Sequence, residues 1–533
     1  MSFLGWCKAT FGFAHDLQLS PSRYVAVFNY FIDFQIFIYK FLTNGKRIGA
    51  NGRSIGANGK RICANGRNVG ANDKRIGVNG RNVGANGKRL GANGRSVGTN
   101  GKRIGTDYLK ENKNPTFTRM KKFLCLLLIL NSQFSILNCF AGGFQVNLQG
   151  QKQSGMGHTG TGLRLDAASI LFNPGAVCFA DSMSSIYAGA SFIIPHTTYL
   201  ELFPGTYTTN TELHIGTPFT LYAAIKLKRN KNIFVGGGIY TPFGSRNQWP
   251  DDWKGQFLIR EIELKTIFIQ PTISYRINEK WGIGGGPIFA TGGFVLRKGI
   301  PVQDSSGFYG EGLLEGSATG FGFNAGIYFQ ATEKISFGLD YRSSVKVNVK
   351  DGSANFSVAA SLQEYFPLTT FNTEIKLPQV ITLGSGFCVN EKLKLALDIN
   401  YIAWSSYDTL RIDFKDTTAK LQNIRSAREY KNVFIFRAGM QYKIGKIFLF
   451  RCGAYYDMSP APDGYLTPET PDQNKIGITA GGTIAISEKF NFDFSFLYIE
   501  GMKRTDTNIE TQFGGTYKSR AFVPGFSVEY NFW

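Results

Sequence analysis

Side chains suited to catalysis are sparse in the second part of the chain. Three histidines follow residue 141, namely His158, His196 and His214, and no recognisable nucleophile motif surrounds them. The segment Gly155-x-Gly157-x-x-Gly160 has the spacing of a dinucleotide-binding loop but lacks the strand, helix and acidic partner that such a loop needs. We interpret its glycines as points of close backbone packing in a compact plug. These residues favour neither an enzyme, such as a lipase or protease, nor a cofactor-binding protein.

The cysteines also show no functional pattern. The seven of them lie at positions 7, 63, 125, 139, 178, 388 and 452, without a Cys-x-x-Cys pair. Three follow residue 141, an odd number. Disulfide frameworks and zinc sites need paired or closely spaced cysteines, so neither is expected, and no metal or other cofactor is predicted.

The net charge of +21 is concentrated near the N-terminus. Residues 1–119 carry 20 Lys and Arg against 5 Asp and Glu, whereas residues 142–533 carry 37 against 33. A nucleic-acid partner inferred from the overall charge would depend on the first segment alone, and none is expected.

Residues 44–106 contain nine copies of a seven-residue unit, Asn-Gly-Lys-Arg-Ile-Gly-Ala and its variants. A coiled coil is disfavoured, because each glycine costs a helix roughly 1 kcal/mol and the unit has no pair of apolar positions to offset that cost. Three interpretations remain: a basic tail without fixed structure, a tether to an anionic surface, or a translated upstream repeat that precedes the true start. Residues 1–119 are therefore a low-complexity basic extension or a mis-assigned start.

The third interpretation is favoured by the residues that follow. Met120 is flanked by Arg119, Lys121 and Lys122 and is followed by eight apolar residues at 123–130. Cys139 and Ala141 then place small residues at the −3 and −1 positions of a cleavage site. This order of basic, apolar and small residues predicts a secretory signal peptide at 120–141.

The hairpin from Lys475 to Tyr498 shows the strand pattern of the remaining chain most clearly. In its second arm, alternate residues are Phe490, Phe492, Phe494, Phe496 and Tyr498, and polar residues lie between them. Alternation with a period of two predicts a strand. A row of phenylalanines is too apolar for a water-facing surface, and the opposite row is too polar for a dry core. A barrel wall between lipid and a polar lumen satisfies both faces, although alternation alone does not exclude a soluble barrel or sandwich.

Six short polar turns organise this region. They lie at 228–232, 278–280, 332–334, 390–392, 443–446 and 487–489. Six turns join twelve strands, and an opening strand near 184–194 and a closing strand near 520–532 bring the total to fourteen. The links between these pairs are expected to be long loops: 245–260, 291–320, 343–379, 405–432, 457–474 and 501–519.

Short turns at one rim and long loops at the other are typical of outer-membrane barrels. The predicted fold is all-β: a transmembrane antiparallel β-barrel of about 14 strands at 184–533, with an N-terminal hatch at 142–183 inside the lumen. The expected location is the outer membrane of a Gram-negative-type bacterium, as a multi-pass monomer in contact with outer-membrane lipid. The aromatic closing strand resembles the signal read by the barrel-insertion machinery, so that machinery is an expected partner.

Short motifs in a fixed order carry a family resemblance over about 142–533. They are Gly142-Gly143-Phe144-Gln145, Asn173-Pro174-Gly175, Glu263-Leu264-Lys265-Thr266, Gln270-Pro271-Thr272, Gly322-Phe323-Asn324-Ala325-Gly326, Tyr341-Arg342-Ser343, Trp404-Ser405, Asp457-Met458-Ser459-Pro460 and Pro471-Asp472-Gln473. Through these motifs and their order, the sequence resembles the FadL/TodX family of outer-membrane transporters for long-chain fatty acids and hydrocarbons. Gly175 departs from the family's usual Asn-Pro-Ala motif.

The resemblance implies passive uptake of a hydrophobic ligand through a barrel closed by a hatch. The ligand would move from an outer groove to an inner pocket and leave through a lateral gap in the wall. Asn173, Pro174 and Gly175 are the expected hatch residues.

The resemblance also implies where the ligand binds. The basic residues that it places near the ligand carboxylate are Arg297, Arg425 and Arg428, each of which could instead be a solvated loop group. Trp249, Trp253 and Phe257 are expected in the outer groove, or alternatively in an interfacial aromatic belt. An adhesin or receptor that uses long loops is the alternative function.

Overall fold

The structure, a computed structural model, describes residues 143–180, 184–227 and 229–532, together with short strands between 47 and 104. It divides into two compact units, Met1–Ser135 and Ile136–Trp533. The predicted signal peptide at 120–141 lies outside the described residues.

The repeat segment contains short parallel strands, where its composition suggested a tail without fixed structure. They are β1 (Arg47–Ile55), β2 (Arg61–Val69), β3 (Arg75–Asn79), β4 (Asn82–Val83), β5 (Arg89–Asn93), β6 (Ser96–Val97) and β7 (Arg103–Ile104). Arg47 pairs with Arg61, and Arg61 with Arg75. Each step of this ladder therefore advances by two repeat units.

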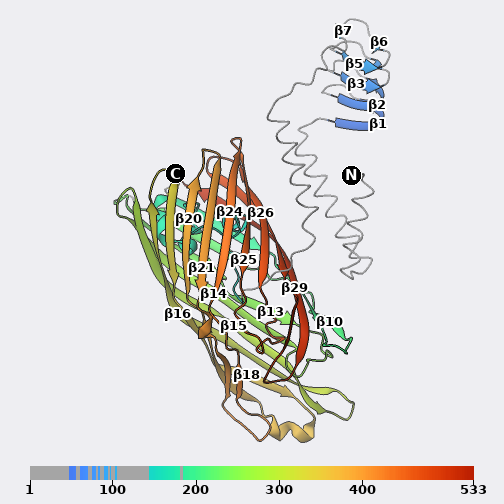
Figure 1. The fold of residues 1–533 in the computed structure, drawn as a ribbon, viewed down its shortest axis with the longest axis vertical. Coiled ribbons are helices and arrows are strands. Elements are labelled where there is room, and N and C mark those ends of the chain that lie inside the picture. Colours follow the sequence, from blue (N-terminus) through green and yellow to red (C-terminus); the bar gives the residue numbers. More distant parts are fainter. Residues whose placement is uncertain are drawn as a thin grey trace. The chain divides into compact units, whose positions relative to one another are not determined.

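The second unit is a closed antiparallel β-barrel of fourteen wall strands, several of which consist of two consecutive labelled strands (Figure 1). The first seven are β8 (Ser184–Ser191) with β9 (Ile194–Leu200), β10 (Thr208–Asn210) with β11 (Phe219–Lys226), β12 (Ile233–Tyr240) with β13 (Gly244–Gln248), β14 (Glu261–Arg276), β15 (Trp281–Gln303), β16 (Tyr309–Gln330), and β17 (Ile335–Arg342) with β18 (Val345–Ser357).

The second seven complete the wall. They are β19 (Thr369–Leu377) with β20 (Val380–Cys388), β21 (Leu393–Ile402) with β22 (Thr409–Phe414), β23 (Ile424–Ala427) with β24 (Val433–Ile444), β25 (Phe448–Asp457), β26 (Lys475–Ala485), β27 (Phe490–Gly501) with β28 (Arg504–Thr507), and β29 (Gly514–Asn531). Two short 3-10 helices interrupt this part, η3 (Ala360–Tyr365) and η4 (Trp404–Ser406). The last strand closes on the first, with Phe526 opposite Ala190. Closure leaves no strand edge unpaired in lipid.

All six predicted short turns are confirmed, and four of them share one hydrogen-bond pattern. The first side chain of each Xaa-Glu-Lys turn accepts from the backbone N–H groups two and three residues later. Asn278 Oδ1, for example, accepts from Lys280 N at 2.8 Å and from Trp281 N at 2.9 Å. Thr332, Asn390 and Ser487 do the same. These are Asx- and Ser/Thr-type turns, which explains the repeated sequence.

Three of the predicted long loops are wrong. One of them, 501–519, is shortened to a link at 508–513 by β28 and the start of β29. The predicted links at 291–320 and 343–379 are largely strand, because β15 and β16 pair almost continuously to a link at 304–308. The link after β18 is confined to 358–368 and includes η3. A strand needs only about 9–11 residues to cross a bilayer, so these strands extend well beyond it, and the loop prediction ended them too early.

The predicted faces of the wall are confirmed. Leu397 and Phe436 are 51% and 47% exposed on the outer surface, whereas Asp398 and Arg437, one position later in their strands, are 1% and 6% exposed. Asp493 and Ser495 are likewise buried between outward phenylalanines of β27. The apolar row contacts lipid, and the polar row faces the interior.

Residues 143–180, which we call the inner segment, pack against the inward face of the wall. The segment contains α4 (Gln151–Ser154), α5 (Ser169–Phe172) and η2 (Pro174–Phe179). It contacts wall strands on opposite sides of the ring: α4 meets β26, β27 and β29, whereas η2 meets β14, β15 and β16. Among the described residues, no helix has the length and apolar content needed to cross a bilayer. We call residues 143–149 the arm and residues 150–180 the body.

Backbone lies directly against backbone where the body meets the wall. At eleven wall glycines, an added Cβ would lie within 3.2 Å of inner-segment atoms; they are Gly236, Gly282, Gly284, Gly326, Gly338, Gly384, Gly386, Gly439, Gly453, Gly481 and Gly525. We call them the glycine belt. The inner segment contributes glycines of its own, since a Cβ at Gly162 would lie 2.6 Å from the backbone of Ser385. The prediction of close backbone packing is confirmed in the same way at Gly155 and Gly157, whereas Gly160 packs against the side chains of Gln153 and Phe172.

Buried charges join the body to the wall at a second place. Lys152 Nζ lies 2.5 Å from Glu529 Oε2 and 3.3 Å from Asp166 Oδ2. Arg451 Nη1 lies 3.8 Å from Asp493 Oδ1 in the same cluster. Buried charges are tolerated only when they are paired, so removing one partner would leave an uncompensated charge and cost about 3–5 kcal/mol.

Candidate functional site

The third wall strand is interrupted at residues 241–243. Pro242 has no N–H group to donate, so the ladder of β12 stops and β13 resumes after it. The arm bonds into this interruption: Val146 N donates to the Pro242 carbonyl at 2.8 Å, and Gly244 N donates to the Phe144 carbonyl at 3.0 Å. The arm therefore acts as a backbone partner for the wall where the wall is interrupted.

The edge of β13 that faces the second wall strand makes few backbone hydrogen bonds. Strand β11 begins at Phe219, and residues 211–218 before it are not in a regular strand. Among the described residues, one backbone hydrogen bond joins this stretch to β13, from Glu212 N to the Gln248 carbonyl at 2.8 Å. The second and third wall strands are thus weakly joined beside the interruption.

The ring of Phe144 lies in an aromatic box on the inner side of this place. The box consists of Phe243, Trp404, Tyr407 and Tyr430. The Phe144 centroid is 4.7 Å from that of Trp404, 5.5 Å from Tyr407 and 6.3 Å from Phe243, all in edge-to-face geometry. Tyr430 completes it, 5.3 Å from Tyr407. All five rings are buried. The box is an apolar chamber filled by a side chain of the arm.

Arg428 lies beside the box and has an unused donor. Its side chain is 2% exposed and pairs with Glu469. It also interacts with the Tyr407 hydroxyl. Its Nη1 is buried and has no hydrogen-bond partner among the described residues. A buried unpaired guanidinium N–H is costly, and a ligand carboxylate would satisfy it with a charge-assisted hydrogen bond.

Arg297, predicted as a carboxylate-binding residue, is already saturated with acidic partners. Its Nη1 lies 2.7 Å from Asp251 Oδ1 and 3.0 Å from Glu311 Oε2, and its Nε lies 3.6 Å from Glu261 Oε2. Strand alternation puts it on the opposite face from the buried Phe294. It is therefore not brought together with Arg428.

The neighbouring Lys298 is the residue of β15 that is electrostatically close to the Arg428 site. Its charge interacts with Glu469, the partner of Arg428. Alternation places it on the same face as Phe294 and Leu296. Lys298 was not predicted from the sequence as a site residue. It lies two residues after Leu296, on the apolar face of the strand, and this position was the feature that could have indicated it.

Arg425 lies on an exposed hairpin of β22 and β23. It pairs with Asp413 and donates to the Ile424 carbonyl at 2.8 Å. Its side chain is 48% exposed. The two arginines predicted together thus differ, Arg428 being buried beside the box and Arg425 being solvated.

Trp249 and Trp253 are fully buried and stacked, with centroids 4.6 Å apart and ring planes 15° apart. Their Nε1 groups donate to the carbonyls of Pro468 at 3.0 Å and Ile259 at 2.7 Å. They pack with Tyr199 rather than lining an open surface. Phe257 lies elsewhere, 4.8 Å from the Tyr309 ring.

The predicted hatch residues form a tight knot against the wall. Asn173 Nδ2 donates to the carbonyls of Thr161 and Ile327, both at 2.9 Å, and its Oδ1 accepts from Gly175 N at 3.0 Å. Pro174 begins η2 with its fixed φ. Asn173 therefore ties two parts of the inner segment to β16.

A hollow of about 400 Å³ opens at the tip of the long strands. We call it the tip hollow. Its apolar lining is Leu313, Phe356, Val358 and Leu368, and it includes the carboxylate of Glu311, which pairs with Arg297. Leu368 is 74% exposed, as is Phe308 in the adjacent link. Large side chains this exposed on a loop indicate an apolar contact surface.

The sequence did not predict a binding role for the box residues Phe144, Phe243, Trp404 and Tyr407. A signal was present, because Tyr407 is an aromatic residue inside the predicted loop 405–432 and Trp404 directly precedes that loop. Their convergence was not visible, since Phe144 and Trp404 are far apart in the sequence. Among the described residues, no group of acidic, histidine and cysteine side chains could hold a metal ion.

Comparisons with known proteins agree on one group. A family model described as "Outer membrane protein transport protein (OMPP1/FadL/TodX)" matches residues 135–532. A long-chain fatty acid transport protein of Escherichia coli O6:H1 is 22% identical over 438 residues, which cover 74% of this chain and 94% of that protein.

Solved structures share the fold. A Pseudomonas aeruginosa FadL homologue superposes with a TM-score of 0.64 at 17% identity, covering 74% of this chain and all of that chain. The Pseudomonas putida toluene transporter TodX gives 0.56 at 15% identity, covering 74% and 99%.

Proposed function

The chain belongs to the OMPP1/FadL/TodX family of outer-membrane transport proteins, and we propose that it carries long hydrophobic molecules, fatty acids or hydrocarbons, across the outer membrane of a Gram-negative-type bacterium. The observation that carries this proposal is the aromatic box, which is apolar, inside the barrel and filled by a side chain of the arm. The relatives named for fatty acid and toluene transport support the substrate class.

The tip hollow is the proposed first contact. A hydrophobic molecule in water gains about 25 cal/mol for each Å² of apolar surface that it buries, and the exposed Phe308 and Leu368 offer such surface beyond the membrane. Phe257 lies against Tyr309 at the same end of β16, so it can contribute to this surface. Trp249 and Trp253 would contribute only after the loop that carries them opens.

The box is the proposed inner binding site. A ligand chain would displace the Phe144 ring and take over its contacts with Trp404 and Tyr407. A fatty acid would place its carboxylate at Arg428 Nη1, with Lys298 near the same Glu469. A hydrocarbon would use the aromatic contacts alone.

Displacement of Phe144 provides a physical link to the exit. The Phe144 carbonyl and Val146 N both bond to the interruption at 241–243. If the ring leaves the box, these bonds break, and the third wall strand loses its partner where the second strand gives little support. The ligand would then pass sideways through the wall into the membrane.

The body is the proposed fixed part of the hatch, with Asn173, Pro174 and Gly175 at its tightest contact. The glycine belt and the Lys152 cluster hold it to strands all around the ring. The arm, which has fewer such contacts, is the proposed moving part. No catalytic step and no cofactor is needed for this cycle, because binding and release are both driven by apolar burial.

We further propose that the protein works as a monomer in outer-membrane lipid. The closing strand β29 pairs within its own chain, with Phe526, Val528 and Tyr530 facing outward. These alternating aromatic and apolar residues are the proposed contact for the barrel-insertion machinery during assembly.

Uptake into vesicles tests the function directly. Purified protein in lipid vesicles that contain a fatty-acid-binding protein should accumulate tritiated oleate and hexadecane from outside faster than protein-free vesicles. A variant with Trp404→Ala and Tyr407→Ala, which removes two sides of the box, should transport both more slowly. Equal accumulation with and without the intact protein would refute transport.

A further inference from the structure

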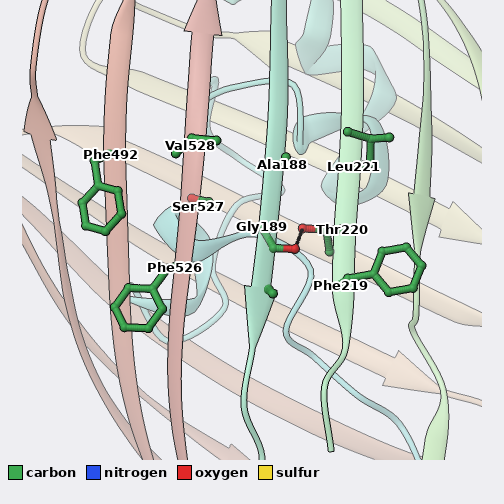
Figure 2. A pocket seen from close by; sticks show the side chains of 10 residues that line it. Ala188, Gly189, Phe219, Thr220, Leu221, Phe492, Phe526, Ser527 and Val528 are labelled. Atoms are coloured by element: carbon green, nitrogen blue, oxygen red, sulfur yellow. Dashed lines mark hydrogen bonds between the residues drawn. The ribbon is translucent and has the colours of Figure 1, made fainter. Parts of the chain in front are cut away.

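A hollow of about 460 Å³ lies on the lipid-facing surface of the wall, across the first, second and last strands, with Phe492 of the thirteenth strand at its edge (Figure 2). We call it the wall slot. Its floor is the stretch Ala188, Gly189 and Ala190 of β8. Its sides are aromatic and aliphatic, and it lies outside the lumen that holds the aromatic box.

Strand register explains the shape of the slot. Ala190 pairs with Phe526 of β29 on one side and with Phe219 of β11 on the other. Ala188 pairs in the same way with Val528 and Leu221. Figure 2 shows the bare central strand with the rings of Phe526 and Phe219 on opposite sides of it.

The slot is therefore about one strand wide and runs along β8. Neighbouring backbones are about 4.8 Å apart, so the flanking strands are separated by roughly 10 Å, part of which is filled by their side chains. Such a groove accommodates one unbranched hydrocarbon chain lying along the strand. A ring system would make contact with the two sides but not with the floor.

The slot is continuous with the weak place in the wall. Phe219, which forms one side, is the first residue of β11 and follows directly on the irregular stretch 211–218. Thr220 pairs with Tyr240, the last residue before the interruption at 241–243. A chain that leaves between the second and third strands emerges next to the Phe219 side of the slot.

We propose that the wall slot is a binding site for the alkyl chain of the transported molecule after it has left the lumen. This proposal rests on the transport function and lateral exit proposed above. The departing chain exchanges its contacts in the box for contacts with Phe219, Phe526 and the alanine floor, so it is never exposed to water. The slot also favours straight-chain fatty acids and alkanes over aromatic hydrocarbons.

A photo-crosslinking amino acid at position 526, where it replaces a ring that already forms one side of the slot and leaves the floor open, tests occupancy. In vesicles, p-benzoylphenylalanine at this position should become labelled by tritiated oleate that is supplied from outside. The same residue at Ala325, an outward position on β16 remote from the slot, should be labelled at least fivefold less. Equal labelling at the two positions would overturn the proposal.

The source of the bound chain is distinguished in a second arm of the experiment. Tritium is placed in the vesicle phospholipid instead of in the oleate. Labelling of position 526 by phospholipid alone, with none from oleate, identifies the slot as a lipid site and overturns the assignment to cargo.

Filling the slot tests its role in transport. Ala188→Phe occupies the floor and should slow oleate uptake several-fold without changing oleate affinity in detergent, because the box is untouched. Ala325→Phe, the matched control, should leave both unchanged. Uptake by Ala188→Phe at the rate of the unmodified protein would contradict the proposal.

Failure of the slot and failure of the function give different results. If the unmodified protein transports oleate but position 526 is not labelled, the slot proposal alone fails. If the unmodified protein does not transport oleate or hexadecane, the function itself fails. Folding of each variant is checked by its heat-dependent shift in gel mobility.

Discussion

Arg428 is the residue with the most specific chemical prediction. Its buried Nη1 has no partner among the described residues, and it lies beside the box. The variant Arg428→Met with Glu469→Gln removes both members of this ion pair together, so neither is left without the other. Since hydrogen bonds to charged groups contribute about 1.5–3 kcal/mol, oleate affinity should fall roughly 10- to 100-fold, with hexadecane affinity unchanged. Tryptophan fluorescence titration of the purified protein measures both.

Arg297→Ala is the natural comparison. The sequence resemblance predicts that it weakens fatty acid binding and spares hydrocarbons, whereas its three acidic partners leave little capacity for another anion. A loss for oleate confined to the Arg428 variant would make Arg428 the carboxylate site. Equal losses for acid and alkane in either variant would exclude a role in recognising the carboxylate.

Single residues were predicted unevenly from the sequence. Asn173 and Pro174 were found because a local motif carries their local role, and the Asn173 hydrogen bond to Gly175 is itself local. Arg428 was named but its burial was not foreseen, because burial depends on Tyr407 and Glu469, which lie in links elsewhere in the sequence. Phe144 was named only as part of a family motif and not as a binding residue, since a phenylalanine near a cleavage site has no local feature that marks it as part of a box.

At the scale of elements, Gly175 shows how closely the body meets the wall. A Cβ there would lie 2.8 Å from the carbonyl oxygens of Gly282 and Gly326. Gly175→Ala must therefore shift η2 and should destabilise the protein by about 1–3 kcal/mol. The midpoint of urea unfolding in vesicles measures this.

The control for that substitution is Gly293→Ala. A Cβ at Gly293 has its nearest neighbour 3.9 Å away, so this variant should unfold at the midpoint of the unmodified protein. A destabilisation of Gly293→Ala as large as that of Gly175→Ala would show that the effect comes from losing glycine and not from the contact.

The arm is predicted to move as a unit. Gln145 and Phe243 are opposite each other in an antiparallel bridge, where Cα atoms are about 4.5–5.5 Å apart, which suits a disulfide. In a protein whose native cysteines are replaced by alanine, Gln145→Cys with Phe243→Cys should block oleate uptake when oxidised. Dithiothreitol should restore it. The two single-cysteine variants are the controls, and uptake unaffected by oxidation would mean that the arm stays in place during transport.

Strands and turns were predicted from the sequence better than single site residues were. Four of the six turns were found because their Asx- and Ser/Thr-type hydrogen bonds need particular residues at fixed offsets. The lengths of β15 and β16 were not predicted, because beyond the membrane their sequence is rich in glycine and loses the apolar row that marks a strand. Pairing with each other holds them in the ladder there.

For the whole molecule, the orientation of the wall predicts where a charge is tolerated. Leu397 is 51% exposed on the lipid side of β21, so Leu397→Arg should destabilise the inserted barrel by about 2–4 kcal/mol. Phe308→Arg, in the link at 304–308, should change the stability of the barrel little, because that link is in water. Unfolding in vesicles at increasing urea concentration distinguishes the two, and similar midpoints would contradict a lipid-facing surface at Leu397.

The start of the mature protein is a further prediction at this scale. Cleavage after Ala141 would leave Gly142 as the first residue and would remove the repeat segment. Mass spectrometry of protein purified from outer membranes should give the mass of residues 142–533. A mature protein that retains the repeat would contradict both the predicted signal peptide and the mis-assigned start.

The glycine belt has a consequence for the order of assembly. The body touches strands on opposite sides of the ring with no side-chain thickness between the two backbones, so a finished cylinder leaves no route by which it could be inserted afterwards. The nascent polypeptide must hold residues 150–180 in position while the sheet curls around them, and the seam between β29 and β8 is sealed last. A barrel made without them and later given the missing piece as a separate peptide should stay empty.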